Sequence, residues 1–526
     1  MVTRPKMLLF SHLCSEGYIT GAEKLLILFA KEWRRHFDCV LVVPREGVIA
    51  AQARALGIPV IIFEIPLNTA LYFASPFAGI HFNALKQQMV YQRLQALLVR
   101  ERPSCVFVNT AVHPLPAAAA KSLGIPVIWS LMEAIRPSPH RRVTLDIIAG
   151  CSDIIAGISQ AVLQPFKSHP AAAKTFVLTP YADLEGLNPD AWPHLRAVIR
   201  ASQGWTEGEC VFGYVTGTIY PQKGLEAFVR AAIKLKNDPR ARFFVAGNPV
   251  DRDYWLSCQA LIRQAGMEDR FRWLLFEENL ELIYPAVDVV VVPSIMPEGF
   301  GMTALEAMVF GKPVIAFASG GLAEILEATG NGEFLVEPGN VAGLAAKMQW
   351  LMDNPSHRTF VGEHSRAAAQ TVFGVHVLRY QQDLLVARLP IVANPPSPLV
   401  RGSGKTVYLL EDGRRRPFRT QQGFLFRGFR FEDVRVIPDR ELHRYRLGRP
   451  MDGGTGVRST VRRRKARAKA KRTAIRRRYR LNRQRRLRAA VRGRRSLRPK
   501  SVLRGERIRR SAAGRRRPSS GRKKRR

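Results

Sequence analysis

Two carboxylates, Glu298 and Glu306, enclose seven residues that include Gly299 and Gly301. Glycines let a ligand approach the backbone, and the free N–H groups and partial positive charge at the start of a helix favour a phosphate. If the helix begins near Gly301, Glu306 lies roughly a turn and a half inside it at about 1.5 Å per residue, while Glu298 stands outside its start. The spacing predicts that the two side chains hold opposite ends of one ligand, unlike the close carboxylate pair of a glycosidase.

The residues around this pair predict a strand, a loop and a helix. Residues 287–292 form an apolar run typical of a buried parallel strand. The helix after the loop has apolar residues every three to four positions, at Met302, Leu305 and Val309. Gly311 and Pro313 end this helix, because Gly tolerates the left-handed turn past the last carbonyl and Pro cannot continue the hydrogen-bond ladder. On spacing alone, an ordinary amphipathic helix with two solvent-facing glutamates is the other interpretation.

This strand, loop and helix, with Glu298 and Glu306 at this spacing and a Gly-Lys-Pro-Val sequence after them, resembles the donor site of family 4 glycosyltransferases. In that family the first glutamate binds hydroxyls of the donor sugar, the second binds the nucleotide ribose, and the amides between them hold the diphosphate. The resemblance implies that Glu298 is catalytic and binds the donor. It implies donor binding also for the residues that follow: Gly299, Phe300, Gly301, Met302, Thr303 and Glu306.

The chain has 526 residues, which is too long for one core and predicts two or three domains. Short apolar runs alternate with longer helical stretches in its first third, which predicts a parallel sheet covered by helices on both faces. These runs are residues 7–10, 39–43, 60–63, 105–109, 127–130, 154–158 and 176–179. The alternation restarts near residue 209. The resemblance implies the α/β architecture called GT-B, in which two doubly wound, Rossmann-like domains face a cleft.

The chain divides into seven predicted segments. We predict an N-terminal acceptor-side domain over residues 1–180, a linker over 181–208, a nucleotide-sugar domain over 209–370 and a crossover helix over 371–390. A second linker (391–406), a small β-rich accessory module (407–450) and a basic tail (451–526) complete the chain. In the module, the segments expected to form short strands and turns are residues 407–418, 423–426, 431–437 and 442–447. The module is interpreted as binding a glycan or organising a complex, or as a passive spacer.

Charge is concentrated at the C-terminal end. Residues 457–526 contain 34 Lys and Arg and one acid, Glu506, so their net charge is +33. This tail lacks the apolar residues for a core and repels itself, so we expect it to be disordered when free. A charge this large favours contact with polyanions over simple solvation. The expected partner is an anionic membrane surface or a nucleic acid.

The six cysteines are scattered, without a C-x-x-C pair, so the sequence predicts neither a zinc site nor a disulfide framework. The N-terminal apolar run is too short for a signal peptide, and no run reaches the roughly 18 apolar residues of a membrane span. We therefore expect a cytoplasmic protein without a transmembrane segment. A peripheral position at the inner face of the membrane is compatible with the basic tail.

Three polar loops follow predicted strands of the first domain, where ligands of parallel sheets bind. The family loop after the first strand reads Gly-Gly-Ala-Glu; Thr20 replaces its first Gly, and the resemblance assigns Gly21 to the donor and Glu23 to the acceptor side. A helix-start role is the other interpretation of Glu23. The resemblance gives His113 a catalytic hydrogen bond to the donor sugar, although loop histidines are often solvated or capping. Glu133 is expected to face the acceptor, with a plain surface carboxylate as the alternative.

The second domain begins with a strand and a Gly turn that lead to Lys223. By resemblance Lys223 is catalytic and binds the donor diphosphate. Thr218 is assigned to the donor site too, but it occupies the place where the family has an arginine. A hydroxyl cannot replace the charge or the fork geometry of a guanidinium. Either Lys223 and the helix N-terminus suffice, or Arg242, Arg252 or another cation compensates.

The resemblance thus implies a retaining, hexosyltransferase-type glycosyltransferase. Its substrates would be a nucleotide-diphosphate sugar and an acceptor such as a cell-surface polysaccharide, a lipid-linked sugar or a protein glycan. No cofactor is expected, and no metal, because no D-x-D stands where one would hold it. One alternative is a polyanion-binding protein whose glycosyltransferase-like body is not catalytic. A phosphorylase of the same architecture is a weaker alternative, since no motif for a lysine-bound cofactor is found.

Overall fold

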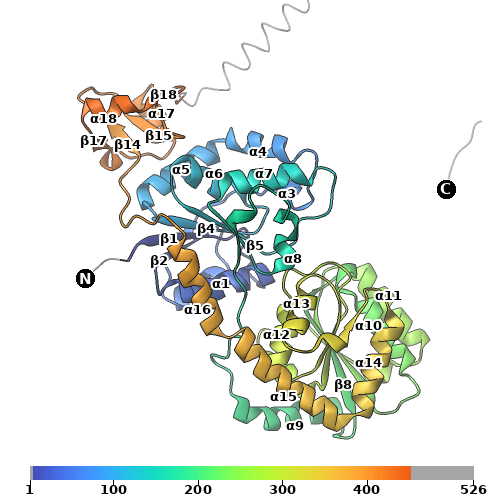
Figure 1. Cartoon of the computed structure of the whole chain (residues 1–526). Coiled ribbons are helices and arrows are strands. Elements are labelled where there is room, and N and C mark those ends of the chain that lie inside the picture. Colours follow the sequence, from blue (N-terminus) through green and yellow to red (C-terminus); the bar gives the residue numbers. More distant parts are fainter. Residues whose placement is uncertain (1–3, 276, 452–526) are drawn as a thin grey trace, which may run out of the picture. The chain divides into compact units, whose positions relative to one another are not determined.

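A computed structural model describes residues 4–275 and 277–451 of the chain. The predicted basic tail, apart from Met451, lies outside these described residues. The described residues contain three sheets, which are built by consecutive stretches of sequence. Two large parallel sheets form the body, and a small mixed sheet forms the module near the C-terminal end (Figure 1).

The N-terminal sheet has the strand order β3-β2-β1-β4-β5-β6-β7, and every pair in it is parallel. Its order reverses between β1 and β4, the switch point beyond which doubly wound sheets bind ligands. The strands are β1 (Lys6–Phe10), β2 (Asp38–Val43), β3 (Val60–Ile62), β4 (Cys105–Asn109), β5 (Val127–Leu131), β6 (Ile154–Gly157) and β7 (Thr175–Val177). The helices between them are α1 (Gly21–Trp33), α2 (Val48–Ala55), α3 (Thr69–Tyr72), α4 (Ala78–Lys86), α5 (Met89–Glu101), α6 (Pro114–Ser122), α7 (Arg141–Cys151) and α8 (Gln160–Leu163).

The second sheet has the order β10-β9-β8-β11-β12-β13 and is also parallel throughout. Its strands are β8 (Cys210–Ile219), β9 (Ala241–Pro249), β10 (Phe271–Leu274), β11 (Val289–Val292), β12 (Val314–Phe317) and β13 (Leu335–Val336). Helices α10 (Leu225–Lys234), α11 (Arg252–Gln264), α12 (Met302–Val309), α13 (Gly321–Ala328) and α14 (Val341–Asp353) surround it. The prediction of two doubly wound parallel-sheet domains is confirmed.

The strands of both sheets are rich in apolar residues because both faces of each sheet are covered by other elements. All four residues of β11 are valines and all are buried, as expected for a central parallel strand. One strand is irregular: the pairing of β8 with β9 shifts its register between Val215 and Thr218. Irregularities of this kind bend a strand and change the direction of its side chains. They are common next to functional sites. The shift lies at the carboxyl end of β8, in the stretch that carries Thr218.

Two long helices return the chain to the first domain. They are α15 (Pro355–Val372) and α16 (Val375–Ala387). On α16, the Arg379 side chain donates to the Glu32 carboxylate of α1 at 2.6 Å, and the Gln382 amide donates to the carbonyl of Phe29. The predicted crossover segment therefore packs on the N-terminal domain.

The segment interpreted as a linker, residues 181–208, contains a helix, α9 (Trp192–Gln203). Its Pro, Asp, Asn and Gly content favoured a linker, but the face of α9 that carries Arg200 packs on the second domain. Arg200 is 1% exposed and donates to the Asp288 carboxylate at 2.9 Å. The linker-like composition therefore fits only the two ends of this segment. Its middle is a helix that a buried ion pair holds in place.

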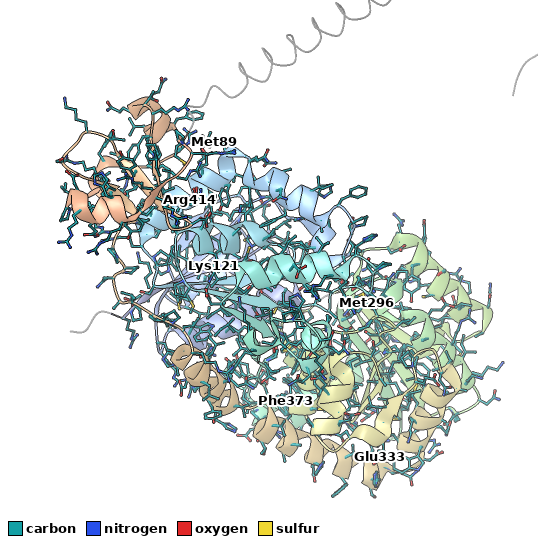
Figure 2. The ribbon with its side chains drawn as sticks, turned by 45° about the horizontal axis from the view of Figure 1, so that its top comes forward. Met89, Lys121, Met296, Glu333, Phe373 and Arg414 are labelled. Atoms are coloured by element: carbon teal, nitrogen blue, oxygen red, sulfur yellow. The ribbon has the colours of Figure 1, made fainter. Side chains whose placement is uncertain are left out.

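The accessory module is a five-stranded sheet within the described residues, in the order β17-β14-β15-β16-β18. Its strands are β14 (Leu399–Arg401), β15 (Tyr408–Glu411), β16 (Arg414–Pro417), β17 (Arg435–Val436) and β18 (Arg446–Leu447), with helices α17 (Gln421–Phe426) and α18 (Asp439–Arg444). Exposed Arg414 at the start of β16 is labelled in Figure 2.

Two expectations for the module were wrong. β14 lies inside the predicted linker, and the predicted strand or turn at residues 423–426 is part of α17. The apolar triplet there favoured a strand, but the Thr420 hydroxyl accepts the N–H of Gly423 at 3.0 Å and starts a helix.

The module packs on α5 and α6 of the N-terminal domain. The amide of Gln95 donates to Glu411 at 2.6 Å, and the N–H of Asp412 donates to the Ser122 carbonyl at 2.8 Å. Ala96 and Val99 of α5 join the core of the module. In the part of the chain that the structure describes, no helix is long and apolar enough to cross a membrane.

Candidate active site

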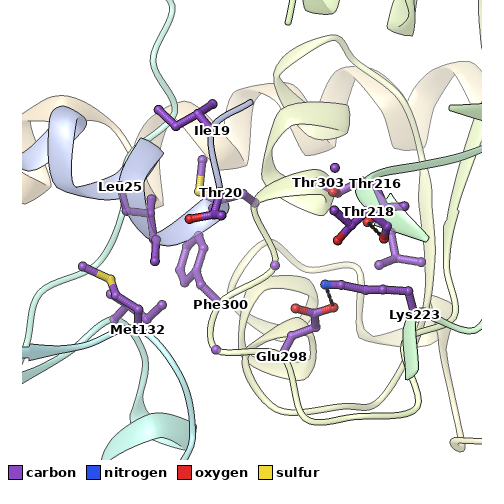
Figure 3. Close-up of a pocket in the computed structure, with 18 of the residues that line it drawn as sticks. Ile19, Thr20, Leu25, Met132, Thr216, Thr218, Lys223, Glu298, Phe300 and Thr303 are labelled. Carbon is purple, nitrogen blue, oxygen red and sulfur yellow. Dashed lines mark hydrogen bonds and ion pairs between the residues drawn. The ribbon is translucent and has the colours of Figure 1, made fainter. Parts of the chain in front are cut away.

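Two adjoining cavities lie between the two large domains. The first has a volume of about 260 Å³ and is bounded by the start of α1 on one side and by the end of β8 and the start of α12 on the other (Figure 3). The second, of about 270 Å³, extends from it toward Lys24 and Glu306. The two cavities share residues on both domains, among them Gly21, Thr216 and Thr303. The two cavities therefore lie side by side, and together they offer room for an elongated ligand.

Glu298 stands on the wall of the first cavity, on the loop between β11 and α12. Its Oε1 atom accepts the Lys223 ammonium at 2.6 Å and the Ser294 hydroxyl at 2.5 Å. Figure 3 shows the Lys223 and Glu298 side chains pointing toward each other. Among the described residues, no side chain or N–H donates to its other oxygen, Oε2. The backbone of Glu298 is held too, because its carbonyl accepts the N–H of Gly321 at 2.9 Å.

Lys223 ends a short 3₁₀ helix after β8 and is followed by Gly224. Gly224 has φ +76°, and a Cβ there would lie 1.9 Å from the Pro293 carbonyl oxygen. Only glycine therefore fits this crossing of the β8 loop and the Glu298 loop. Burial lowers the pKa of Lys223, but the Glu298 carboxylate and Tyr220 raise it, and its pKa lies above the ordinary lysine value. Lys223 is thus a fixed positive charge.

The N-terminus of α12 opens onto both cavities. Gly301 precedes the helix with φ +117°, and no side chain caps the end. A Cβ at Gly301 would lie 2.6 Å from Leu322, so both the backbone conformation and the packing require glycine. Met302 and Thr303, the first two helical residues, line both cavities. Their N–H groups and the helix dipole favour an anionic group at this point.

Glu306 lies one turn further along α12, on the wall of the second cavity. Its Oε2 atom accepts the hydroxyl of Tyr284 at 3.1 Å, and its Oε1 atom accepts the Lys24 ammonium at 2.5 Å. Burial raises the pKa of Tyr284 well above its usual value, which keeps the hydroxyl protonated as a donor. Glu298 and Glu306 therefore line different cavities of the adjoining pair, in keeping with their spacing.

Most of the predicted donor-site residues line these cavities. Gly299, Phe300 and Thr218 are on the wall of the first one, together with Gly21 from the opposite domain. The two cations considered as substitutes for an arginine at position 218 lie elsewhere. Arg242 pairs with Glu209, and Arg252 is exposed at the start of α11. Neither of them contributes to the cavity walls.

The structure places Glu23 outside the cavity. Its carboxylate accepts the N–H of Thr20 at 2.9 Å, and its own N–H donates to the Thr20 hydroxyl at 3.4 Å. This reciprocal pair is a capping box for α1. Glu23 is fully buried. In this structure its role is the helix-start role, and an acceptor contact stays a prediction that would need the loop to move.

His113 and Glu133 differ from the other predicted site residues in their surroundings. His113 is 1% exposed, packs edge-on against Phe10, and has a pKa lowered to about 3 by burial and by nearby His12. The Glu133 carboxylate accepts the N–H groups of Ala111 and Met132, and burial raises its pKa to about 7. Neither residue is on the wall of the two cavities. Their proposed contacts with sugar and acceptor therefore stay predictions.

Sequence reasoning missed three residues that hold the two glutamates. Ser294 supports Glu298, while Tyr284 and Lys24 contact Glu306. Ser294 is in the same loop as Glu298 and could have been found by its proximity. Lys24 and Tyr284 are distant in sequence from Glu306, and only the folded structure brings them together. Within the described residues, no three His, Cys, Asp or Glu side chains are grouped so that they could hold a metal ion.

Comparison with known proteins identifies a family model and several similar proteins. Residues 196–368 match the family model described as glycosyl transferases group 1. D-inositol 3-phosphate glycosyltransferase of Mycobacterium sp. (strain KMS) is 33% identical over 232 residues, which are 43% of this chain and 49% of that protein. 2-deoxystreptamine glucosyltransferase of Streptomyces kanamyceticus is 34% identical over 173 residues, or 32% of this chain and 43% of that protein. The chain spans about half the length of the curated relatives it matches.

Solved structures with the same fold cover more of the chain. The structure of HepE from Anabaena in complex with UDP superposes with a TM-score of 0.60 at 22% identity, over 73% of this chain and all of HepE. Sucrose-phosphate synthase from Thermosynechococcus elongatus gives a TM-score of 0.56 at 18% identity, over 73% of this chain and 99% of that protein. The body of this protein therefore has the GT-B fold, and within it residues 196–368 match the model of glycosyl transferases group 1.

Proposed function

We propose that this protein is a glycosyltransferase that moves a hexose from a nucleotide-diphosphate sugar to an acceptor hydroxyl, with retention of configuration and without a metal ion. One observation carries the proposal. Two adjoining cavities between the two domains have Glu298 and Lys223 on the wall of one, Glu306 on the wall of the other, and the uncapped N-terminus of α12 on both. This order of groups fits sugar, diphosphate and ribose in succession.

Each part of the site would bind one part of the donor. Glu298 accepts hydrogen bonds from sugar hydroxyls, and its contact with Lys223 keeps it in place. The N–H groups of Met302 and Thr303 and the Lys223 ammonium hold the diphosphate. Glu306, anchored by Tyr284, accepts from the ribose hydroxyls. The Lys223 ammonium and the dipole of α12 would then stabilise the leaving diphosphate in place of a metal ion.

The proposed chemical step exchanges one bond for another at the anomeric carbon. The bond from this carbon to the β-phosphate oxygen breaks, and a bond to the acceptor oxygen forms on the same face of the sugar. The acceptor proton passes to the departing phosphate oxygen, so the products are the glycosylated acceptor and the nucleoside diphosphate. Holding the acceptor beside the leaving group is the main contribution of the protein to this step.

The acceptor is proposed to be a surface glycan or a lipid-linked sugar that enters from the N-terminal domain. Two curated relatives bear names that specify D-inositol 3-phosphate and 2-deoxystreptamine as their acceptors. Small cyclitols of this kind therefore belong in the first acceptor panel. HepE was solved with UDP-glucose, which makes a UDP-sugar the first donor to try.

The test is a panel of UDP-, GDP-, ADP- and dTDP-sugars given to the full-length protein, with and without EDTA. Release of one nucleotide at the same rate in EDTA is expected. When an acceptor from the cyclitol panel is added, an α-linked donor should give an α-linked product by NMR. If no donor is hydrolysed and no nucleotide binds by calorimetry, the proposal is wrong. Attention would then turn to a non-catalytic body that binds polyanions. Loss of release in EDTA would contradict only the metal-independent part.

A further inference from the structure

The first cavity has fewer positive charges than a donor diphosphate calls for. Thr218 is on its wall at the position where the resemblance expects an arginine. Lys223 is present, but it is already paired with Glu298 at 2.6 Å. Among the described residues that line the two cavities, the cationic side chains are Lys223 and Lys24. Lys24 is therefore the second cation on these walls, and it too is paired in this structure, with Glu306.

Lys24 approaches the site from the opposite domain. It lies in the first turns of α1, three residues after Gly21, and its side chain is 40% exposed. Its ammonium contacts Oε1 of Glu306 at 2.5 Å, and this carboxylate raises the pKa of Lys24 although burial opposes the shift. The contact joins the two domains across the second cavity. It occupies the oxygen that the ribose hydroxyls would use.

The other oxygen of Glu306 explains how this contact can be exchanged. Oε2 is held by the hydroxyl of buried Tyr284 at 3.1 Å. The carboxylate thus keeps its position when Lys24 leaves, and ribose hydroxyls can take the Oε1 atom. The ammonium of a lysine sits on a flexible four-carbon stem and can swing to a new partner. When a donor binds, its diphosphate is the negatively charged partner that the Lys24 ammonium can reach.

We propose that Lys24 is a donor-binding residue that supplies the diphosphate with the positive charge missing at Thr218. In the absence of a donor, the Lys24 ammonium pairs with Glu306. When the donor ribose binds Glu306, this pair is broken and the ammonium contacts the phosphates. The inference rests on the proposed function, because it requires a nucleoside diphosphate in this space. It makes the N-terminal domain a direct contributor to phosphate binding and couples donor binding to the contact between the domains.

The test compares a nucleoside diphosphate with its nucleoside by calorimetry on the full-length protein. UDP and uridine are used first, then GDP with guanosine and ADP with adenosine. Lys24→Met should weaken binding of the diphosphate about tenfold or more, the scale of a lost charge-assisted hydrogen bond, and leave the nucleoside unchanged or slightly tighter. Lys31→Met is the matched control, because Lys31 lies on the same helix but pairs with Asp183 at 3.4 Å.

Two further variants keep the test decisive. Lys24→Arg retains the charge and should bind the diphosphate nearly as well as the wild type. Thr218→Arg in the Lys24→Met background should restore most of the lost affinity if the two positions supply the same charge. Unchanged or tighter diphosphate binding by Lys24→Met, or equal weakening of diphosphate and nucleoside, would overturn the inference. A wild-type protein that binds no nucleoside diphosphate would instead overturn the proposed function.

Discussion

Glu298 and Lys223 depend on each other at the scale of single residues. The carboxylate is 17% exposed and the lysine 23%, so neither is well solvated and each needs the other's charge. Ser294 adds a hydroxyl donor to the same carboxylate oxygen. Because two donors fix Oε1, the remaining oxygen has a defined direction before any ligand arrives. Preorganisation of this kind is what makes a charged group effective in catalysis.

His113 makes the N-terminal domain sensitive to acid. Burial lowers its pKa to about 3, so the folded protein keeps the imidazole neutral while the unfolded chain binds a proton below about pH 6.5. The unfolded state then binds more protons, and stability falls as pH decreases from about 6.5 toward 3. The loss from this group is at most about 1.4 kcal/mol per pH unit.

The measurement is urea unfolding of the wild type and His113→Phe at pH 7 and pH 5. We expect the variant, which cannot be protonated, to lose less free energy of unfolding between the two pH values than the wild type. His140→Asn serves as the control, since His140 is exposed. Parallel losses in the wild type and His113→Phe would show that His113 does not carry the acid sensitivity.

At the scale of elements, the loop before α12 fits the N-terminal domain only because residue 299 is a glycine. A Cβ on Gly299 would lie 2.2 Å from the carbonyl oxygen of Met132, at the end of β5. The Gly299 carbonyl also accepts the Ser159 hydroxyl at 2.6 Å. The donor loop is therefore held against the carboxyl ends of N-terminal strands.

Gly299→Ala should push the loop and the β5 end apart. We expect donor turnover to fall about tenfold or more, because displacements of this size disturb the alignment of reacting groups. The melting temperature should change less than activity does. Gly17→Ala is the matched control, since no atom lies within 4 Å of a Cβ at Gly17. Wild-type turnover in Gly299→Ala would contradict this role of the loop.

Helix α8 is capped by a residue of the other domain. The Glu324 carboxylate of α13 accepts the N–H groups of Gln160 and Ala161, at 2.8 and 2.5 Å. Glu324→Ala should reduce the free energy of unfolding by about 1 kcal/mol, the usual effect of losing a helix cap. It should also loosen the contact between the domains, which small-angle scattering can detect. Glu327→Ala, on the exposed face of the same helix, should change neither quantity.

The elements also show how far sequence alone could go. Apolar runs flanked by turn residues predicted strands in both large sheets, because strands buried on both faces are nearly continuous runs of apolar residues. The predicted linker contains a helix that its composition did not indicate, and the strand or turn expected at residues 423–426 is part of α17, for opposite reasons. A long-range pair, Arg200 with Asp288, holds α9, while a local cap at Thr420 decides α17. Lys24 and Glu306 are separated by most of the body, and no local pattern pairs them.

At the scale of the whole molecule, the two-domain body and the basic end of the sequence are expected to act separately. Residues 457–526 carry 34 of the 83 Lys and Arg residues of the chain. Removal of residues 452–526 should leave turnover of a soluble acceptor within about twofold of the full chain and abolish salt-sensitive binding to polyanions. Flotation with anionic vesicles and filter binding with RNA measure the two candidate partners.

Neutral vesicles provide the control for this truncation. If the shortened protein still binds anionic vesicles or RNA as tightly as the full chain, the basic end is not the polyanion contact. The accessory module would then be the next surface to test, because it carries several exposed arginines, among them Arg414 and Arg440. Loss of turnover on truncation would contradict the separate action of the two parts.

The central claim is that Glu298 binds and orients the donor sugar in the space between the two domains. The most direct measurement is the steady-state turnover of Glu298→Gln with the donor that the panel identifies. We predict a fall in kcat of about 100-fold or more with an unchanged melting temperature, because the amide cannot supply the negative charge. Glu46→Gln, at an exposed surface pair with Arg54, should behave as the wild type. Wild-type kcat in a folded Glu298→Gln protein would contradict the account.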